Sequence, residues 1–204
     1  MLELIDDMGW SQQVLKEATR HVYPRIKFLR LAFERMKQPR AMPQPIHRIL
    51  FVCRGNIIRS ALATAYFVEQ ASKHGFIMKV KSAGMETQPG KPAHALAKEI
   101  AHQHGLSLHC HSTTPLSQDL IKESDLVLVM EVAQKDRLSK LYAHDRHKVF
   151  MLGQFCRNGS IEIDDPYCGT QEDFKACFGR IRESCDHLIQ KIGELTCPGK
   201  FGPG

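Results

Sequence analysis

From His47 onward, short apolar runs alternate with stretches of helical periodicity, and this alternation constrains the fold more than any other feature. The apolar runs at 49–53 and 126–130 are typical of buried strands, and two further strands are predicted at 78–82 and 148–151. Helical stretches follow them at 60–74, 93–104, 132–142 and 172–192. Strands that alternate with helices predict a parallel sheet covered on both faces. We therefore expect an α/β fold with a four-stranded parallel sheet flanked by helices.

Residues 1–45 differ in character from the main domain, which we place at 46–204. They predict a helical extension with helices at 11–21 and 24–37, followed by a proline-rich linker. In the second helix, apolar residues recur at helical spacing between basic ones. This pattern predicts an amphipathic helix that packs on the main domain. Binding to a partner or to a membrane surface is the alternative.

Charge and cysteine content narrow the function classes. The net charge is +6, which suits anionic partners, but no basic segment is interleaved with the aromatics that stack on bases, so we expect no nucleic acid. The seven cysteines show no zinc-binding spacing, and we expect no metal or cofactor. No secretory signal or membrane-spanning run is visible, which predicts a cytoplasmic protein with reduced thiols.

The turn after the first strand carries the chemistry. It reads C-x5-R-S, with Cys53 at the strand end, Arg59 and Ser60 at the start of a helix, and Gly55 and Asn56 between them. A loop that closes onto a helix N-terminus directs backbone N–H groups at an anion, either a phosphate or a thiolate. Cys53 is thus the candidate nucleophile, able to form a phosphocysteine. The planar guanidinium of Arg59 suits two phosphate oxygens at once.

The other loop residues fit the same purpose. Gly55 permits close approach of the backbone to an anion, and Asn56 tolerates a left-handed conformation. Ser60 can donate its hydroxyl to the Cys53 sulfur and cap the helix. In a parallel sheet, the carboxyl ends of the strands form the expected ligand site.

These residues resemble a known family. VCRGNIIRS is similar to the V-C-x-G-N-x-C-R-S motif of low-molecular-weight protein-tyrosine phosphatases, and the similarity extends over about residues 46–193. It is carried further by SAG at 82–84, GKPA at 90–93, SDLVLVME at 124–131 and DDPYCGTQEDF at 164–174. The resemblance is closest to bacterial members associated with polysaccharide export. It implies hydrolysis of phosphotyrosine, and a phosphate-binding loop that includes Arg54, Gly55, Asn56, Ile57, Ile58 and Ser60.

The resemblance also implies roles for residues outside the loop. The family's Asp-Pro-[Tyr/Phe] loop matches residues 165–167, so Asp165 is the expected general acid and Tyr167 the expected wall of the substrate slot. We expect the neighbouring Asp164 to keep the loop solvated or to add a weak electrostatic effect, and not to act as the acid. His111 matches a histidine that helps to hold the phosphate loop through its asparagine. The implied partners are a tyrosine-phosphorylated protein, such as a cognate tyrosine kinase, and inorganic phosphate as product.

The sequence departs from the family in places, and alternatives remain open. Many relatives carry a second cysteine where this chain has Ile58, so we hypothesise that Cys53 oxidises more readily beyond sulfenic acid. Arginine phosphatases of this fold carry threonine in place of Ile57, which favours tyrosine but leaves a protein-arginine phosphatase as an alternative. Arsenate reductases of this fold need two further cysteines after the third strand. Residues 126–138 contain none, which disfavours that alternative. A phosphotyrosine-binding module without turnover is the non-enzymatic alternative.

Overall fold

The computed structural model describes residues 41–157 and 160–196, together with Leu29. Apart from Leu29, the helices predicted at 11–21 and 24–37 lie outside the described residues, so they stay predictions. The domain boundary between residues 45 and 46 also stays a prediction. Within the described part of the chain, no helix combines the length and the apolar character needed to cross a membrane.

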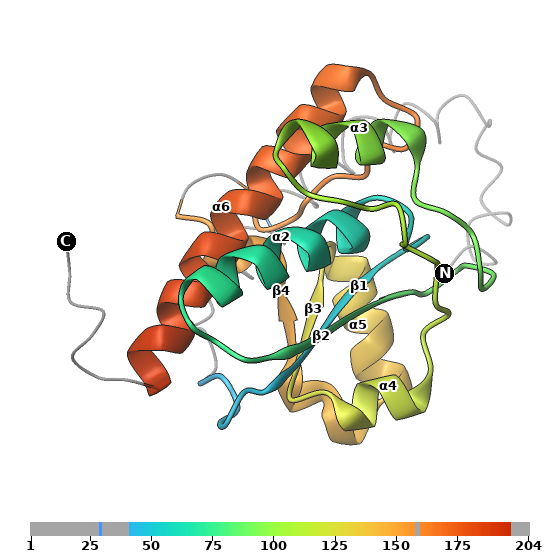
Figure 1. Cartoon of the computed structure of the whole chain (residues 1–204). Helices are drawn as coiled ribbons and strands as arrows, with labels where there is room; N and C mark the ends of the chain where they lie inside the picture. Colours follow the sequence, from blue (N-terminus) through green and yellow to red (C-terminus); the bar gives the residue numbers. More distant parts are fainter. Residues whose placement is uncertain (1–28, 30–40, 158–159, 197–204) are drawn as a thin grey trace, which may run out of the picture. The chain divides into compact units, whose positions relative to one another are not determined.

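A four-stranded parallel sheet forms the centre of the main domain (Figure 1). Its strands are β1 (Arg48–Cys53), β2 (Lys79–Gly84), β3 (Leu126–Val129) and β4 (Val149–Met151). Their order across the sheet is β2-β1-β3-β4, with every neighbouring pair parallel. Cys53 pairs with Gly84, and Val52 pairs with Val129, so the carboxyl ends of three strands meet at one edge. The predicted fold is confirmed.

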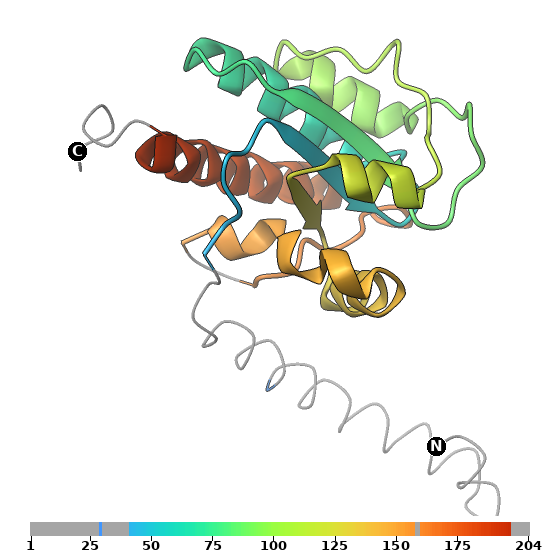
Figure 2. The same cartoon turned by 90° about the horizontal axis from the view of Figure 1, so that it is seen from below.

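Helices cover both faces of this sheet. They are α2 (Arg59–Lys73), α3 (Ala95–Gln103), α4 (Gln118–Glu123), α5 (Val132–Leu141) and α6 (Gln171–Thr196). Figures 1 and 2 show α2, α3 and α6 together on one side of the sheet, and α4 and α5 on the other. Because parallel sheets bury both faces, this arrangement explains why β1 and β3 are nearly continuous apolar runs. The edge strand β2 differs, since exposed and half-buried residues alternate along its first four positions.

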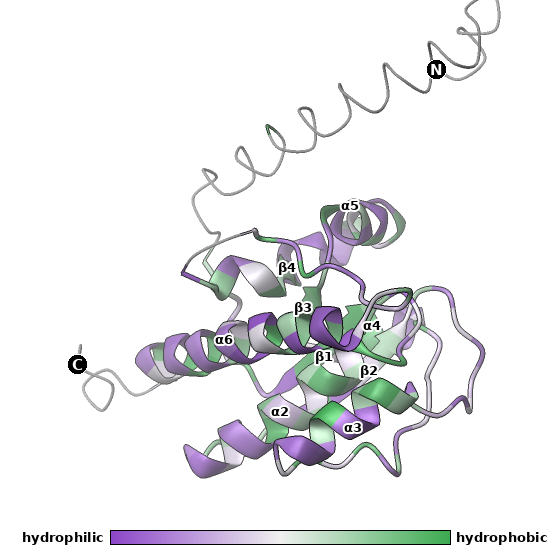
Figure 3. Cartoon of the chain, turned by 90° about the horizontal axis from the view of Figure 1, so that it is seen from above, coloured by the Kyte–Doolittle hydropathy of each residue, from purple (hydrophilic) through white to green (hydrophobic). Residues whose placement is uncertain are grey.

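The core follows from the alternation of side chains along β1. Ile49 and Phe51 belong to the large apolar cluster under α2 and α6, and the Phe51 ring lies 5.7 Å from that of Phe67. Leu50 and Val52, which alternate with them, are fully buried on the opposite face. The strand β3, which consists of Leu and Val alone, is accordingly green in the hydropathy view, whereas the helices carry both colours (Figure 3). The strand β1 thus contributes side chains to both layers of the core.

Helix α6 closes the main core, and its ends extend beyond those predicted. Thr170 and Asp173 form a reciprocal cap: the Thr170 amide donates to Asp173 Oδ2 at 2.7 Å, and the Asp173 amide donates to Thr170 Oγ1 at 3.3 Å. Apolar residues at spacings of three and four, from Phe174 to Ile192, are buried along its inner face. The predicted helix ended at Ile192, where the apolar pattern ends, but the helix continues to Thr196.

Three short elements were not predicted. Helix α4 is only six residues long, and its single cue is Ser117, whose hydroxyl accepts from the Leu120 amide at 3.3 Å. Two 3-10 segments, η2 (Ala143–Lys148) and η3 (Leu152–Phe155), flank β4. Elements of this length carry too few residues to show a periodic pattern.

Asp125 joins β1 to β3 at the edge remote from Cys53. Its Oδ2 accepts from the backbone amides of His47 and Arg48 at 2.9 and 2.8 Å, and its Oδ1 accepts from the Arg48 guanidinium at 2.8 Å. Burial raises the pKa of the Asp125 carboxyl, but the Arg48 guanidinium and the two amides outweigh burial and hold the pKa below its usual range. The ionised carboxylate is therefore the form that stabilises the fold.

We expect Asp125→Ala to lower the free energy of unfolding by about 1–3 kcal/mol at neutral pH, because it leaves two amides and a guanidinium unpaired. Since the folded-state pKa is lowered, the contribution is present above the unfolded pKa of about 3.9 and is lost as pH falls through the folded pKa. Urea denaturation at several pH values measures this. Glu123→Ala, which removes an exposed pair with Lys81 of 3.1 Å, is the control. A penalty for Asp125→Ala that is independent of pH would contradict the prediction.

Candidate active site

The phosphate-binding loop predicted from the sequence connects β1 to α2. Cys53 ends the strand, Arg59 begins the helix, and residues 54–58 form the turn between them. Asn56 has a positive φ of 55°, as expected for one of the few residues that tolerate this conformation. Gly84 lets the end of β2 approach the loop, because a Cβ there would lie 3.1 Å from the Arg54 carbonyl oxygen and 3.0 Å from the Gly55 carbonyl carbon. The left-handed conformation of Asn56 and the close approach of Gly84 together fix the shape of the loop.

Asn56 is fully buried and connects the loop to its surroundings. Its Nδ2 donates to Ser60 Oγ at 2.8 Å, and its Oδ1 accepts from the Thr114 amide at 2.9 Å. His111 Nε2 lies 2.6 Å from the Asn56 carbonyl oxygen. Because a carbonyl only accepts, the proton of the ring must be on Nε2. The structure therefore brings His111 to the asparagine that the resemblance implied; its effect on activity stays a prediction.

Cys53 is the centre of a second set of hydrogen bonds. Its sulfur lies 3.0 Å from Ser60 Oγ and accepts from the Asn56 amide at 3.2 Å. Asn56 Nδ2 already donates to Ser60 Oγ, so the Ser60 hydroxyl proton is free to point at the sulfur. The prediction that Ser60 also caps α2 is wrong. The helix begins one residue earlier, at Arg59, with Ile58 at the cap position and no side-chain cap.

We expect Asn56→Ala to lower kcat/KM by about 10–100-fold and to lower the melting temperature. Alanine in the left-handed region is strained by about 1–2 kcal/mol, and the two side-chain hydrogen bonds are lost. Asn56→Gly is the matched control, because glycine adopts the positive φ freely but makes neither hydrogen bond. Wild-type kcat/KM in Asn56→Gly would show that the hydrogen bonds of this side chain do not matter for the reaction.

Arg59 is almost completely buried, with 1% of its surface exposed, and lies between two carboxylates. It forms ion pairs with Glu131, which follows β3, and with Asp165, and its Nη1 donates to the Ile163 carbonyl at 3.1 Å. Burial lowers the pKa of the Arg59 guanidinium, but the negative charges of Cys53, Glu131 and Asp165 outweigh it and raise the pKa. Arg59 is therefore a fixed, permanently charged group beside Cys53.

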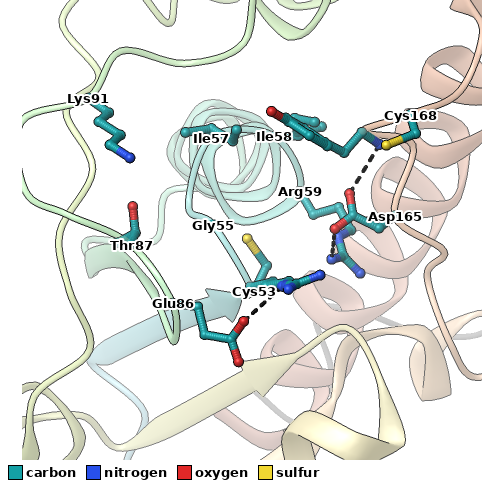
Figure 4. A pocket seen from close by; sticks show the side chains of 12 residues that line it. Cys53, Gly55, Ile57, Ile58, Arg59, Glu86, Thr87, Lys91, Asp165 and Cys168 are labelled. Carbon is teal, nitrogen blue, oxygen red and sulfur yellow. Dashed lines mark hydrogen bonds and ion pairs between the residues drawn. The ribbon is translucent and has the colours of Figure 1, made fainter.

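The predicted site residues surround one cavity of about 440 Å³. Its lining includes all of the loop residues named above except the buried Asn56 and Ser60, together with Asp165, Tyr167, Cys168, Glu86, Thr87 and Lys91. Figure 4 shows Asp165 and Cys168 on one side of the cavity, with Glu86, Thr87 and Lys91 on the other. Cys53, Arg59 and Asp165, from a strand, a helix and a distant loop, thus meet at one opening.

Several residues of the site were missed by sequence reasoning. Glu131 ends the stretch 124–131, but no role was predicted for it. Its position directly after a parallel strand is the feature that indicates a place at the site. Glu86 follows β2 in the same way. Gln134, nearly buried, donates to Glu131 Oε1 at 3.2 Å and holds it toward Arg59. No local pattern indicated Thr114, whose backbone amide contacts Asn56.

Comparison with known proteins now adds to this geometry. The family model described as low molecular weight phosphotyrosine protein phosphatase matches residues 48–196. The chain belongs to this family. It is 33% identical to the low molecular weight protein-tyrosine-phosphatase Wzb of Escherichia coli K12 over 146 residues, which cover 72% of this chain and 95% of the relative.

Relatives within this phosphatase family differ in specificity. The protein-arginine-phosphatase of Bacillus subtilis is 30% identical over 146 residues, covering 72% of this chain and 94% of that protein. Among solved structures, the tyrosine phosphatase Wzb from Escherichia coli K30 in complex with sulphate matches with a TM-score of 0.68 and 27% identity, covering 73% of this chain and all of that one. Family membership alone does not choose between tyrosine and arginine.

Ile58 occupies the loop position where many family members carry cysteine, and it is 3% exposed. The buried thiols of Cys177 and Cys185 stay protonated, because burial raises the pKa of Cys177 to about 12 and that of Cys185 well above its usual range. Cys168 is exposed and lines the cavity on the same side as Asp165 (Figure 4). Among the described cysteines, it is the one that shares a cavity with Cys53.

We expect peroxide to inactivate the protein with only partial recovery on addition of a thiol, because Cys53 has no cysteine neighbour in its loop. Activity after peroxide and reductant, with mass analysis of the Cys53 peptide, tests this. Cys168→Ser is the control and should recover to the same extent. Full recovery that is lost in Cys168→Ser would contradict the prediction and assign Cys168 as the resolving thiol.

Proposed function

We propose that this chain hydrolyses tyrosine phosphate monoesters through a phosphocysteine intermediate on Cys53. The observation that carries the proposal is the meeting of Cys53, Arg59 and Asp165 at one cavity whose floor is a strand–loop–helix turn. A nucleophile, a phosphate-binding cation and a carboxyl group in this arrangement are what two-step phosphoryl transfer needs.

In the first step, the Cys53 sulfur attacks phosphorus, and the bond between phosphorus and the phenolic oxygen breaks. The guanidinium of Arg59 and the backbone amides of the loop bind the phosphoryl oxygens, where negative charge is spread in the transition state. Asp165 donates a proton to the departing phenolic oxygen, so that tyrosine leaves as a neutral phenol. The product of this step is a thiophosphate ester on Cys53.

In the second step, water attacks the phosphorus of the phosphocysteine. Asp165, now ionised, accepts a proton from this water, and the bond between phosphorus and sulfur breaks. Inorganic phosphate leaves, and Cys53 returns as a thiolate. The Ser60 hydroxyl, 3.0 Å from the sulfur, supports this step because a hydrogen bond stabilises the thiolate as leaving group.

The lining of the cavity favours tyrosine over arginine. Ile57, which is half-buried, presents an apolar side chain that suits the flat face of a phenyl ring, and the buried Ile58 also lines the cavity. A phosphoarginine substrate would require acceptors for its guanidinium N–H groups. Both oxygens of Glu86, on the cavity wall, already accept from Arg54 and Arg137. Tyr167, 57% exposed, would lie beside the ring of the substrate as a second wall.

The test compares kcat/KM for p-nitrophenyl phosphate, a phosphotyrosine peptide and a phosphoarginine peptide of the same sequence. We expect both aryl esters to be hydrolysed, and phosphotyrosine to be preferred to phosphoarginine by about 10-fold or more, a preference that apolar complementarity can supply. A preference for phosphoarginine would move the chain to the arginine-specific members. Tight binding of phosphotyrosine without turnover would leave it a binding module.

We propose a tyrosine-phosphorylated protein as the partner, with a cognate tyrosine kinase as the first one to test. We also propose the cytoplasm as its compartment. The described cysteines are all free thiols, two of them exposed, and a nucleophilic thiolate needs a reducing environment. Binding of the N-terminal segment to a partner or a membrane surface stays a prediction from the sequence.

A further inference from the structure

Besides the buried Arg59, the cavity has further basic residues, and these lie together on one wall. Arg54 Nε donates to Glu86 Oε2 at 2.8 Å, and Arg137 Nη1, from helix α5, donates to Glu86 Oε1 at 2.7 Å. A single carboxylate is thus shared by two guanidinium groups. Hydrogen bonds from Arg137 and Arg54 hold the pKa of the Glu86 carboxyl below its usual range. One positive charge of this triad is therefore left without a counter-charge from Glu86.

The wall is attached to the phosphate-binding loop by its backbone as well. The Glu86 amide donates to the Arg54 carbonyl at 2.9 Å, so the two residues are joined twice. Lys91, which also lines the cavity, is held at its backbone by Thr113: the Lys91 amide donates to Thr113 Oγ1 at 2.9 Å, and the Thr113 amide donates to the Lys91 carbonyl at 2.9 Å. Thr113 is 2% exposed, so this anchor is rigid.

We call Arg54, Glu86, Lys91 and Arg137 the basic rim. Three cations and one anion give it a surplus of two positive charges. Within the described residues, no ion pair engages the Lys91 ammonium. Figure 4 places Glu86 and Lys91 across the cavity from Asp165. Asp165, which pairs with Arg59, therefore does not neutralise this wall directly.

We propose that the basic rim selects phosphotyrosine sites with acidic residues next to the phosphotyrosine, an inference that rests on the proposed function. Once the phosphate is in the loop, residues one to three positions away reach about 3–10 Å along an extended peptide. Arg54, Glu86 and Lys91 line the same cavity as the loop, so the side chains of such residues can approach them. Exposed charges discriminate modestly, through KM, and their effect is screened by salt.

The experiment compares three phosphotyrosine peptides of equal length, flanked by Glu, Gln or Lys, each relative to p-nitrophenyl phosphate with the same protein. At about 10 mM salt, where the Debye length is about 30 Å, we expect kcat/KM for the Glu peptide to exceed that for the Gln peptide by about 5–10-fold, through KM. The Lys peptide should be the poorest. At about 1 M salt, the ratio should approach one.

Arg137→Gln and Lys140→Gln form the matched pair of variants. Both residues are exposed on α5 and each change removes one charge, but only Arg137 belongs to the rim, where it donates to Glu86. We expect Arg137→Gln to lower the Glu-to-Gln preference about 2–3-fold and Lys140→Gln to leave it unchanged. Circular dichroism melting of each variant checks its fold.

The outcomes separate this inference from the proposed function. Turnover of all three peptides with equal kcat/KM at low salt would overturn the basic rim and leave the phosphatase in place. An equal loss of preference in Arg137→Gln and Lys140→Gln would assign the effect to the charge of the whole chain, and would also overturn the rim. Absence of turnover with every aryl phosphate would overturn the proposed function and, with it, the selection at the rim.

Discussion

Replacement of Cys53 by serine is expected to reduce hydrolysis of every aryl phosphate by about 10⁴-fold or more, toward the uncatalysed rate. A serine hydroxyl is far less acidic than a thiol, and the groups that contact this position, the Ser60 hydroxyl and the Asn56 amide, are not bases that could deprotonate it. Serine is also close to cysteine in size, so the 2%-exposed position stays filled. The change therefore removes the nucleophile while the fold and the phosphate-binding loop persist.

Two measurements make this expectation decisive. Binding of a phosphotyrosine peptide to Cys53→Ser, followed by calorimetry, should persist, because Arg59 and the loop amides are unchanged. Cys110→Ser is the matched control, since Cys110 is an exposed thiol outside the cavity and its loss should leave kcat unchanged. Turnover above about one hundredth of wild type in Cys53→Ser would show that another group acts as nucleophile.

Replacement of Asp165 by asparagine is expected to lower kcat by about 10²–10⁴-fold with phenyl phosphate, a substrate whose leaving group needs a proton. The loss should be smaller with p-nitrophenyl phosphate, because nitrophenolate departs readily without protonation. An asparagine side chain keeps the shape of aspartic acid but cannot donate an acidic proton to oxygen. The difference between the two substrates therefore reports proton transfer, and not merely the ion pair with Arg59.

Asp164→Asn is the control for this prediction. Asp164 is an exposed carboxylate adjacent in sequence and is not part of the cavity lining. It should keep kcat within about two- or three-fold of wild type for both substrates, as is usual for exposed charges. Equal losses for the two substrates in Asp165→Asn, or a larger loss in Asp164→Asn, would contradict the assignment of Asp165 as general acid.

The fold was predictable because its central strands β1 and β3 are short and almost wholly apolar. All four residues of β3 are buried, and an apolar run of that length between helical stretches suits a central parallel strand. A strand that is apolar on both sides is favourable only where helices cover both faces of the sheet. The N-terminus of α2 was placed one residue late, because no conventional capping residue begins it; Ile58 stands there, and tertiary contacts of the loop fix the helix start.

The site was predictable where its residues are adjacent in sequence, and less so elsewhere. The spacing of Cys53 and Arg59 indicates a phosphate loop directly. Asp165 is 106 residues from Arg59, and only the family resemblance connected the two. Glu131 and Glu86 reach the site because parallel strands end at one edge, so their place depends on strand order, which no local pattern of residues encodes.

The two carboxylates that hold Arg59 have a consequence for the end of each catalytic cycle. A phosphate ion must compete with Glu131 and Asp165 for the guanidinium, so its net affinity is a difference between two sets of charge-assisted hydrogen bonds. As the product departs, both carboxylates are in place to take up the guanidinium again. Product release is thus an exchange of anions, and we expect weak inhibition by inorganic phosphate even though the arginine that binds it is buried.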